Sequence, residues 1–175
     1  MQRTCIVLIG PKGAGKSFLG AALQSQKEIP FISTEALFLK AREENVPSET
    51  RGAYVLDLLS KEIAEKTSHS PATVSFETTG TNAKVLEYIE QLKGSYRVIL
   101  VKVWTPIEVC IQRISIRNAK KHVPHQESEI RAINQQSEKL KLAYSFEVDT
   151  SAEKPEEMVK KIAAISGGDT SIGKK

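Results

Sequence analysis

Cysteines, aromatic residues and long apolar runs are all scarce in this sequence of 175 residues. The two cysteines, Cys5 and Cys110, lie in apolar stretches without metal-ligand spacing, which predicts buried thiols rather than a zinc site or a disulfide framework. No apolar run approaches the roughly 20 residues that cross a bilayer. The N-terminus, MQRT, lacks the pattern of a signal peptide. We therefore expect a cytoplasmic protein without a membrane partner.

A continuous basic stripe with interleaved aromatic residues, the usual mark of a nucleic-acid binder, is also missing. The net charge is only +4, and aromatic residues make up 6% of the chain. Two of the lysines, Lys174 and Lys175, end the sequence, and others alternate with glutamates along predicted helices. These features argue against a nucleic-acid partner and favour a solvated surface plus an anionic small ligand.

The order of elements predicts an α/β domain. The length fits about one domain, without a repeat or an internal boundary. Short apolar runs rich in β-branched residues predict strands at 4–9, 30–32, 72–76, 97–103 and 145–148. Helical spacing predicts helices at 16–24, 35–44, 48–66, 82–92, 106–117, 127–140 and 155–165, followed by a flexible tail at 166–175. Such alternation favours a mainly parallel sheet with helices on both faces.

The stretch GPKGAGKS, from Gly10 to Ser17, fits the G-x-x-x-x-G-K-[ST] pattern in full. Between a buried strand and a helix, such a loop cradles phosphates, because its bare backbone N–H groups converge and the helix dipole adds positive charge. In this pattern Lys16 reaches the β- and γ-phosphates, and the Ser17 hydroxyl ligates Mg²⁺. We therefore predict ATP and Mg²⁺ as cofactors, bound by Gly10, Pro11, Lys12, Gly13, Ala14, Gly15, Lys16, Ser17 and Phe18.

The stretch CIVLIGPKGAGKSFLGAAL resembles the start of the small P-loop kinases, most of all the shikimate kinase-like group, and is also similar to nucleoside and nucleotide kinases. A weaker likeness extends to about Ile165 through the ST after the second strand, WTPIEVCIQRISIR after the fourth, and FEVDTS near the end. The P-loop is the specific motif, and the remainder is a similarity of layout.

This resemblance implies a P-loop NTPase fold, a three-layer α/β/α sandwich whose five-stranded parallel sheet has the order 2-3-1-4-5. It implies one kinase domain over residues 1–165, with a substrate-binding helical segment at about 35–66 and a mobile basic lid at about 117–127. The implied reaction transfers the γ-phosphoryl group of MgATP to a small-molecule hydroxyl.

Candidate acceptor residues follow the second and third predicted strands, at the edge where open α/β sheets bind ligands. Glu77 is predicted to hold the water shell of Mg²⁺ or to face the substrate. Thr78, Thr79 and Gly80 form a polar turn assigned to the substrate, with capping of the next helix by Thr79 or Thr81 as the alternative. In the shikimate kinases the position of Glu35 carries acidic substrate-binding residues. Glu35 keeps part of that role or is an acidic first-turn residue favoured by the helix dipole.

Two departures from the shikimate kinases leave the acceptor open. The sequence has STE where that group carries its acidic residues, and ETTG where it carries a glycine triplet. Arg51, in the segment that clamps substrate in the family, is predicted to bind a substrate carboxylate or phosphate as a bidentate fork. The alternative for Arg51 is a solvated position on the helix.

The remaining nucleotide-site predictions concern the lid and the last loop. Arg117 is predicted to close over the transferring phosphoryl group, and Arg113 to contact the nucleotide or to be the C-terminal cation of its helix. His122 and His125 are interpreted as lid-surface side chains rather than metal ligands. Ser151 belongs to the loop that lies beside the adenine base in the family.

The leading hypothesis is a small-molecule kinase that uses MgATP. In it, Lys16 neutralises the transferring phosphoryl group, and Glu77 or Glu35 orients the acceptor hydroxyl. Neighbouring alternatives are a nucleoside or nucleotide kinase and a zeta-toxin-like or polynucleotide-end kinase. A nucleotide-dependent ATPase or switch protein is an alternative of a different class. The residues do not choose between ATP and GTP, or between a monomer and a homodimer.

Overall fold

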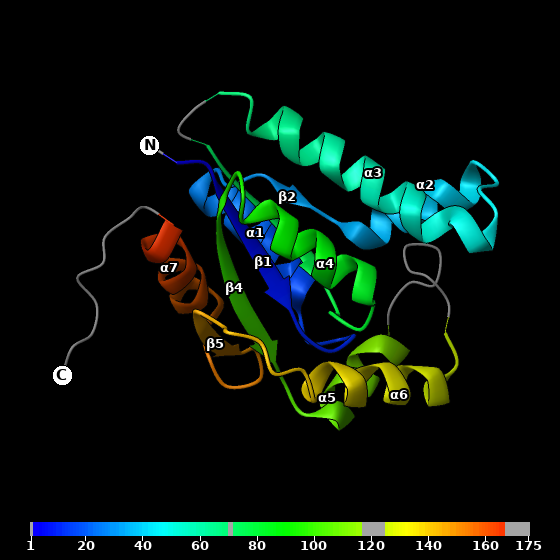
Figure 1. The fold of residues 1–175 in the computed structure, drawn as a ribbon. Coiled ribbons are helices and arrows are strands. Elements are labelled where there is room, and N and C mark those ends of the chain that lie inside the picture. Colours follow the sequence, from blue (N-terminus) through cyan, green and yellow to red (C-terminus); the bar gives the residue numbers. More distant parts are fainter. Residues whose placement is uncertain (1, 70–71, 117–124, 167–175) are drawn as a thin grey trace.

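A computed structural model describes residues 2–69, 72–116 and 125–166 (Figure 1). In these residues five parallel strands form one sheet in the order β2-β3-β1-β4-β5. The strands are β1 (Thr4–Ile9), β2 (Phe31–Ile32), β3 (Thr73–Thr78), β4 (Arg97–Trp104) and β5 (Phe146–Asp149). The helices are α1 (Lys16–Lys27), α2 (Thr34–Glu43), α3 (Ser48–Lys66), α4 (Ala83–Leu92), α5 (Ile107–Ser115), α6 (Glu127–Glu138) and α7 (Pro155–Ser166). The predicted fold class and strand order are confirmed.

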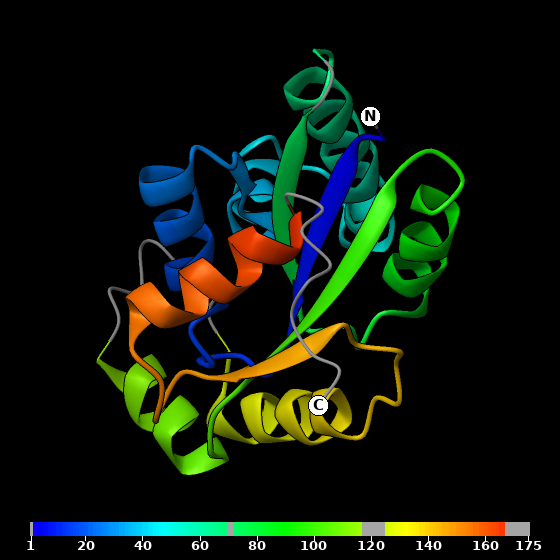
Figure 2. The ribbon, with the colours of Figure 1, turned by 90° about the vertical axis from the view of Figure 1, so that its left-hand side faces the viewer.

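The central strand β1 is buried along its whole length because helices cover both faces of the sheet. Ile6 and Leu8 pack in the apolar core that contains the buried side chains of α1 and α7. Cys5 and Val7 alternate with them and pack in a second core, together with side chains of α3 and α4. Figure 2 shows α7 crossing in front of the sheet, in the layer of α1. The sequence TCIVLI is thus apolar at nearly every position because it has no solvent face.

All five strands end at the same edge of the sheet, where the P-loop follows β1. The helices α5 and α6 lie at this edge, below the strands in Figure 1. The pairing register places Leu8 and Ile9 opposite Glu77 and Thr78 of β3. The loop after Ile9 therefore starts beside the end of β3, and side chains from distant parts of the sequence meet there.

Strand β3 ends at Thr78, two residues beyond the predicted end, because its ladder with β1 continues through Glu77 and Thr78. Glu77 therefore lies inside the strand rather than after it. At the other end of the chain, α7 includes Ser166, which was predicted to begin the tail. The remaining predicted tail, residues 167–175, lies outside the described residues, as does most of the predicted lid, residues 117–124.

The two cysteines are buried, as the sequence predicts. Cys5 and Cys110 are free and buried, and burial raises the pKa of the Cys5 thiol to about 12. This thiol is therefore protonated, and hence a poor nucleophile, at neutral pH. None of the helices in the described ranges combines the length and the apolar character that a membrane span requires.

Candidate active site

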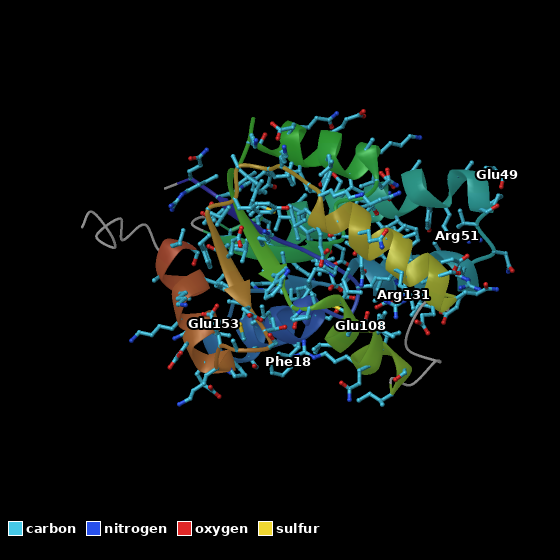
Figure 3. The ribbon with its side chains drawn as sticks, turned by 90° about the horizontal axis from the view of Figure 1, so that it is seen from below. Phe18, Glu49, Arg51, Glu108, Arg131 and Glu153 are labelled. Atoms are coloured by element: carbon cyan, nitrogen blue, oxygen red, sulfur yellow. The ribbon has the colours of Figure 1, made fainter. Side chains whose placement is uncertain are left out.

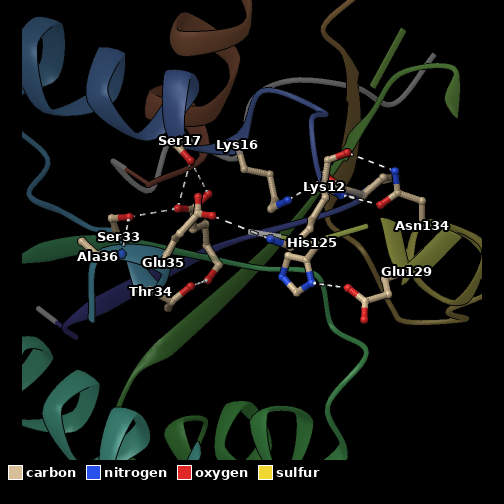
Figure 4. A network of polar contacts seen from close by, with 12 residues as sticks. Lys12, Lys16, Ser17, Ser33, Thr34, Glu35, Ala36, His125, Glu129 and Asn134 are labelled. Carbon is tan, nitrogen blue, oxygen red and sulfur yellow. Dashed lines mark hydrogen bonds and ion pairs between the residues drawn. The ribbon is translucent and has the colours of Figure 1, made fainter. Parts of the chain in front are cut away.

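Lys16, the lysine of the P-loop pattern, is the first residue of α1 and is 7% exposed. Its Nζ donates to the carbonyl oxygens of Gly10 and Pro11 at 2.9 and 2.7 Å (Figure 4). The ammonium group therefore lies across the loop that the pattern assigns to phosphate. Its positive charge is concentrated where a phosphate chain would meet the loop N–H groups.

The glycines of the loop are required by its backbone. A Cβ on Gly10 would lie 1.9 Å from the carbonyl oxygen of Val103, because β4 passes directly behind the start of the loop. Gly13 and Gly15 have φ angles of +86° and +92°, in the left-handed region that disfavours side chains. Ala14 lies between these two glycines and is fully buried. The loop conformation thus depends on bare backbone at the positions that the motif specifies.

Asn134 of α6 makes two hydrogen bonds to the backbone of the phosphate loop. Its Oδ1 accepts from the backbone N–H of Lys12 at 2.7 Å, and its Nδ2 donates to the Lys12 carbonyl at 3.0 Å (Figure 4). The asparagine is fully buried, and three positions along the helix Ser137 donates to the carbonyl of Thr79 at 2.7 Å. Sequence reasoning missed both residues. The signal in the sequence was that Asn134 and Ser137, both polar, fall on the same helix face as the apolar Ile130, which is the buried face of α6.

We predict that Asn134→Ala weakens both the fold and the phosphate loop. The substitution removes the partner of the partly buried N–H and carbonyl of Lys12, which costs about 1–3 kcal/mol of unfolding free energy. Urea unfolding measures this loss, and titration with MgATP should show about tenfold weaker binding, since roughly 1.4 kcal/mol corresponds to tenfold. The exposed neighbour Gln135 gives the control, Gln135→Ala, which should change neither quantity. Wild-type MgATP affinity in Asn134→Ala would refute a role for this clamp.

Glu77 meets the hydroxyl of the P-loop motif. Ser17 Oγ lies 3.0 and 2.8 Å from Glu77 Oε1 and Oε2, and Ser33 Oγ donates to Oε1 at 3.2 Å. The alternation of β3 explains the direction of this side chain, because Phe76 packs in the core that contains α3 and α4, so Glu77 points to the α1 side. The glutamate is 5% exposed.

The oxygen donors of Ser17 and Glu77 fit Mg²⁺. This cation prefers hard oxygen ligands and in nucleotide sites takes one or two protein oxygens besides phosphate and water. In the part of the chain that the structure describes, no three His, Cys, Asp or Glu side chains are grouped to hold a metal. The arrangement therefore suits a metal that arrives with a nucleotide better than a site built by protein ligands alone.

A second lysine of the loop points away from the cradle toward α2. Lys12 Nζ lies 3.7 Å from Glu35 Oε1, and both side chains are about one-fifth exposed (Figure 4). Glu35 lies in the first turn of α2, after the N-cap Ser33. The ion pair thus links the phosphate loop to the helix that follows β2.

A pocket of about 310 Å³ joins these groups. Its donor half consists of loop residues, namely Lys12, Gly13, Gly15, Lys16 and Ser17. Its acceptor half consists of residues from α2, from the β3–α4 region and from the start of the α6 segment, namely Thr34, Glu35, Phe38, Glu77, Thr78, Thr79, Thr81, Asn82, Val85 and His125. Of the predicted substrate residues, the pocket therefore brings together Glu35, Thr78 and Thr79 with the P-loop.

Gly80, predicted to contact substrate, does not line this pocket. Its φ of +73° turns the chain after β3, and a Cβ there would lie 2.5 Å from the side chain of Leu140. The turn is closed by Thr78, whose hydroxyl accepts from the Gly80 N–H at 3.0 Å. The cap of α4 is Asn82, so neither Thr79 nor Thr81 has the capping role considered for them. Their hydroxyls instead contact each other at 2.9 Å.

Arg51, predicted to clamp the substrate, does not line this pocket, and its role toward a substrate stays a prediction. Its guanidinium donates to the carbonyl oxygen of Val46 at 2.8 Å, in the connection between α2 and α3. Figure 3 shows Arg51 with Glu49 near the start of α3, far from Phe18 at the start of α1. The described contacts make it a residue that closes the α2–α3 turn. The side chain is partly buried there.

Arg113 supports the phosphate loop through Thr150. The guanidinium donates to the Thr150 hydroxyl at 2.9 Å and to its carbonyl at 3.0 Å, and the same hydroxyl donates to the Ala14 carbonyl at 2.6 Å. Ser151, beside it, is exposed and bonds to Asp149 Oδ1 through its N–H and hydroxyl at 2.8 and 2.6 Å. Nucleotide contacts of Arg113 and Ser151 stay predictions. Thr150, in the same predicted adenine loop as Ser151, is the residue that joins this loop to the phosphate loop.

Three further predicted residues have different outcomes. Phe18 is 58% exposed at the start of α1 and does not line the pocket, so its contact with a nucleotide stays a prediction. Arg117 lies outside the described residues. His125, interpreted as a lid-surface side chain, is exposed and also lines the pocket, and its Nδ1 lies 3.3 Å from Glu129 Oε2.

A surface ion pair links α6 to α5. Arg131 lies beside Glu108 in Figure 3, with contacts of 2.8 and 3.2 Å. The hydrogen bonds from Arg131 hold the pKa of the Glu108 carboxyl below its ordinary value.

Comparison with known proteins agrees with this geometry. The model of a family described as "AAA domain" matches residues 5–142, which include the P-loop and Asn134. No match among curated proteins is found. Three solved structures illustrate the similarity of fold. A sugar kinase from Janibacter is 15% identical over 99% of both chains, with a TM-score of 0.67.

The other two structures carry different substrate names. A shikimate kinase from Aquifex aeolicus is 22% identical over 98% of this chain and 100% of its own, with a TM-score of 0.65. A gluconokinase from Sinorhizobium meliloti is 22% identical over 95% of this chain and 94% of its own, with a TM-score of 0.61. At these identities the matches show the fold alone, which is that of a P-loop kinase. The matched residues 5–142 span most of the chain, and the chain therefore belongs to the AAA domain family of the P-loop NTPases.

Proposed function

We propose that this protein is a kinase that transfers the γ-phosphoryl group of MgATP to a small molecule. The observation that carries the proposal is the shared pocket, in which the phosphate cradle opens directly onto a second set of polar side chains. A donor and an acceptor bound in the two halves would be adjacent, and this proximity is most of what phosphoryl transfer requires of a protein.

On the donor side, each group has a physical task. The N–H groups of the loop and the N-terminus of α1 bind the phosphate chain, and the buried Lys16 ammonium compensates the charge of the transferring group. The loop is rigid because Asn134 and Thr150 bond to its backbone from α6 and from the β5–α7 connection. A preorganised cradle of this kind loses little free energy to reorganisation when the substrate binds.

Ser17 and Glu77 are the residues proposed to hold Mg²⁺, directly or through water. When bound, this cation neutralises phosphate charge during transfer. Ser33, which donates to Glu77, orients the carboxylate from the neighbouring β2–α2 connection. Such a supporting contact keeps a ligand oxygen in position.

On the acceptor side, Glu35 is proposed to accept the proton of the attacking hydroxyl. It lines the pocket at the first turn of α2, and Lys12 holds its carboxylate toward the loop. Glu77 is less suited to this role, since both of its oxygens are already engaged by the Ser17 hydroxyl. We extend the proposal to a single kinase domain over residues 1–165, with α2 and α3 as its acceptor segment.

A nucleotide-dependent ATPase or switch is the second candidate, because the matching family carries the description "AAA domain". The acceptor half of the pocket favours the kinase, since an ATPase needs room only for water beside the phosphates. Structural neighbours that carry the names of sugar, shikimate and glucono-kinases support the same choice.

The test is acceptor-dependent release of ADP. The protein is incubated with MgATP, or with MgGTP, and with sets of sugars, polyols, nucleosides and hydroxy acids, and ADP or GDP is followed by a coupled assay. We expect one class of acceptor to raise the release well above the rate without acceptor. Release that no acceptor changes would support the ATPase and contradict the kinase.

A further inference from the structure

The charges of the pocket are divided between its halves. Among the described residues that line it, the lysines are Lys12 and Lys16, both in the donor half, and no arginine is present. The acceptor half instead carries the Glu35 carboxylate, whereas Glu77 lies against Ser17 of the donor half, where it is proposed to hold Mg²⁺. A negatively charged acceptor would therefore approach the Glu35 carboxylate, which is proposed to accept the proton of the attacking hydroxyl.

The lysine nearest the acceptor half is already engaged. Lys12 Nζ lies 3.7 Å from Glu35, so an anionic acceptor would have to compete with this carboxylate for the ammonium group. Arg51, the residue predicted to bind a substrate carboxylate or phosphate, is bound to the Val46 carbonyl outside the pocket. The described residues thus offer an anion no bidentate partner in the acceptor half.

The other side chains of the acceptor half suit hydroxyl groups. Thr79 and Thr81 form a hydroxyl pair that can still offer one hydrogen and further lone pairs to a ligand, and Asn82, whose Oδ1 caps α4, adds amide N–H donors. Sugar hydroxyls can pair with groups of both kinds. Phe38 of α2 and Val85 of α4 add an apolar wall. A ring with hydroxyls on one face and C–H groups on the other matches this combination.

We propose that the phosphoryl acceptor is an uncharged, hydroxyl-rich ring compound, such as a neutral sugar or a nucleoside. This inference rests on the proposed function, because it names the class of substrate for the acceptor half of the same pocket. It selects against carboxylated and phosphorylated acceptors on the ground of charge.

The experiment compares neutral acceptors with anionic counterparts that keep the same ring. Neutral ring sugars are paired with their uronic acids and shikimate methyl ester with shikimate, and nucleosides are included as neutral acceptors. The kcat/KM for each member is measured by coupled release of ADP, and the ester is identified by mass spectrometry. We expect the neutral member of a productive pair to be preferred by about tenfold or more, the effect of one like charge nearby.

A charge variant tests the cause of this preference. Thr81→Lys places an ammonium group in the acceptor half and should shift the ratio of neutral to anionic kcat/KM by about tenfold toward the anion. Gln91→Lys adds the same charge to an exposed position of α4 and should leave the ratio unchanged. A purely structural effect of Thr81→Lys would lower kcat/KM equally for the neutral and the anionic acceptor of a pair.

The outcomes separate this inference from the proposed function. Preference of the wild-type protein for an anionic member, or phosphorylation of anionic members alone, overturns the inference. Binding of MgATP with no member of any pair phosphorylated contradicts the proposed function instead. An equal ratio in wild-type protein and Thr81→Lys also overturns it, since the charge of the acceptor half would then be irrelevant. Failure to bind MgATP at all refutes the proposed function itself.

Discussion

Replacing Lys16 by methionine is expected to lower phosphoryl transfer by about 10³-fold. Methionine fills similar space but removes the ammonium group that lies across the loop, bonded to the carbonyls of Gly10 and Pro11. The charge of the transferring phosphoryl group would then be uncompensated in a buried site, where the loss is largest. The rate is measured as acceptor-dependent release of ADP under saturating MgATP.

The fold of Lys16→Met has to be checked beside its rate. Two carbonyl oxygens lose a buried donor, so we expect the unfolding free energy to fall by about 1–3 kcal/mol while the circular dichroism spectrum is kept. Lys84→Met removes a lysine from the exposed surface of α4 and should transfer phosphate at the wild-type rate. A folded Lys16→Met protein that keeps wild-type turnover would show that Gly10–Ser17 is not the donor site.

The second large effect separates the two carboxylates of the pocket. Glu77→Gln should raise the Mg²⁺ concentration needed for half-maximal activity by about 10- to 100-fold, because the carboxylate beside the Ser17 hydroxyl would lose its charge. Glu35→Gln should leave the Mg²⁺ requirement near that of the wild-type protein but reduce kcat by about 10²-fold or more, as expected for loss of a general base. Both are measured by titrating Mg²⁺ at fixed ATP and acceptor.

These two variants test each other. The Gln side chains keep the shape of the site, and neither substitution adds volume. If Glu77→Gln lowered kcat at saturating Mg²⁺ as strongly as Glu35→Gln, the division of roles between the two carboxylates would be wrong. If Glu35→Gln kept the full kcat, Glu35 would have no part in the transfer step.

The donor half was predictable because its information is local. The eight residues from Gly10 to Ser17 carry the positive-φ glycines, the lysine and the hydroxyl in one contiguous pattern, and the apolar run before them has no solvent face. The strand order was also predictable, because the small P-loop kinases that this sequence resembles have the sheet order 2-3-1-4-5, which the structure has as well.

The support of the loop was not predictable from the same information. Asn134 lies 122 residues from Lys12 along the chain, and nothing in its immediate sequence shows which backbone its amide meets. The contact of Arg51 with the Val46 carbonyl was not predictable for a related reason, since a helix position does not reveal the direction of a long side chain.

The acceptor half was predicted only in part, because it is assembled from three separate segments. Glu35, Thr78 and Thr79 were identified from their positions after two adjacent strands. Phe38 and Val85 were not, since apolar residues on amphipathic helices are usually core residues, whereas here both line the pocket. The charge of this half depends on which segments of the chain meet there, and no single motif in the sequence encodes it.

The central claim, that this pocket transfers phosphate rather than hydrolyses ATP, is tested most directly by phosphorus NMR of a reaction with MgATP and a neutral sugar or nucleoside. The account predicts a new phosphate-ester resonance that grows in equal amount with ADP, depends on the acceptor, and is lost in Lys16→Met. Formation of ADP and inorganic phosphate alone, at a rate that no acceptor changes, would contradict it.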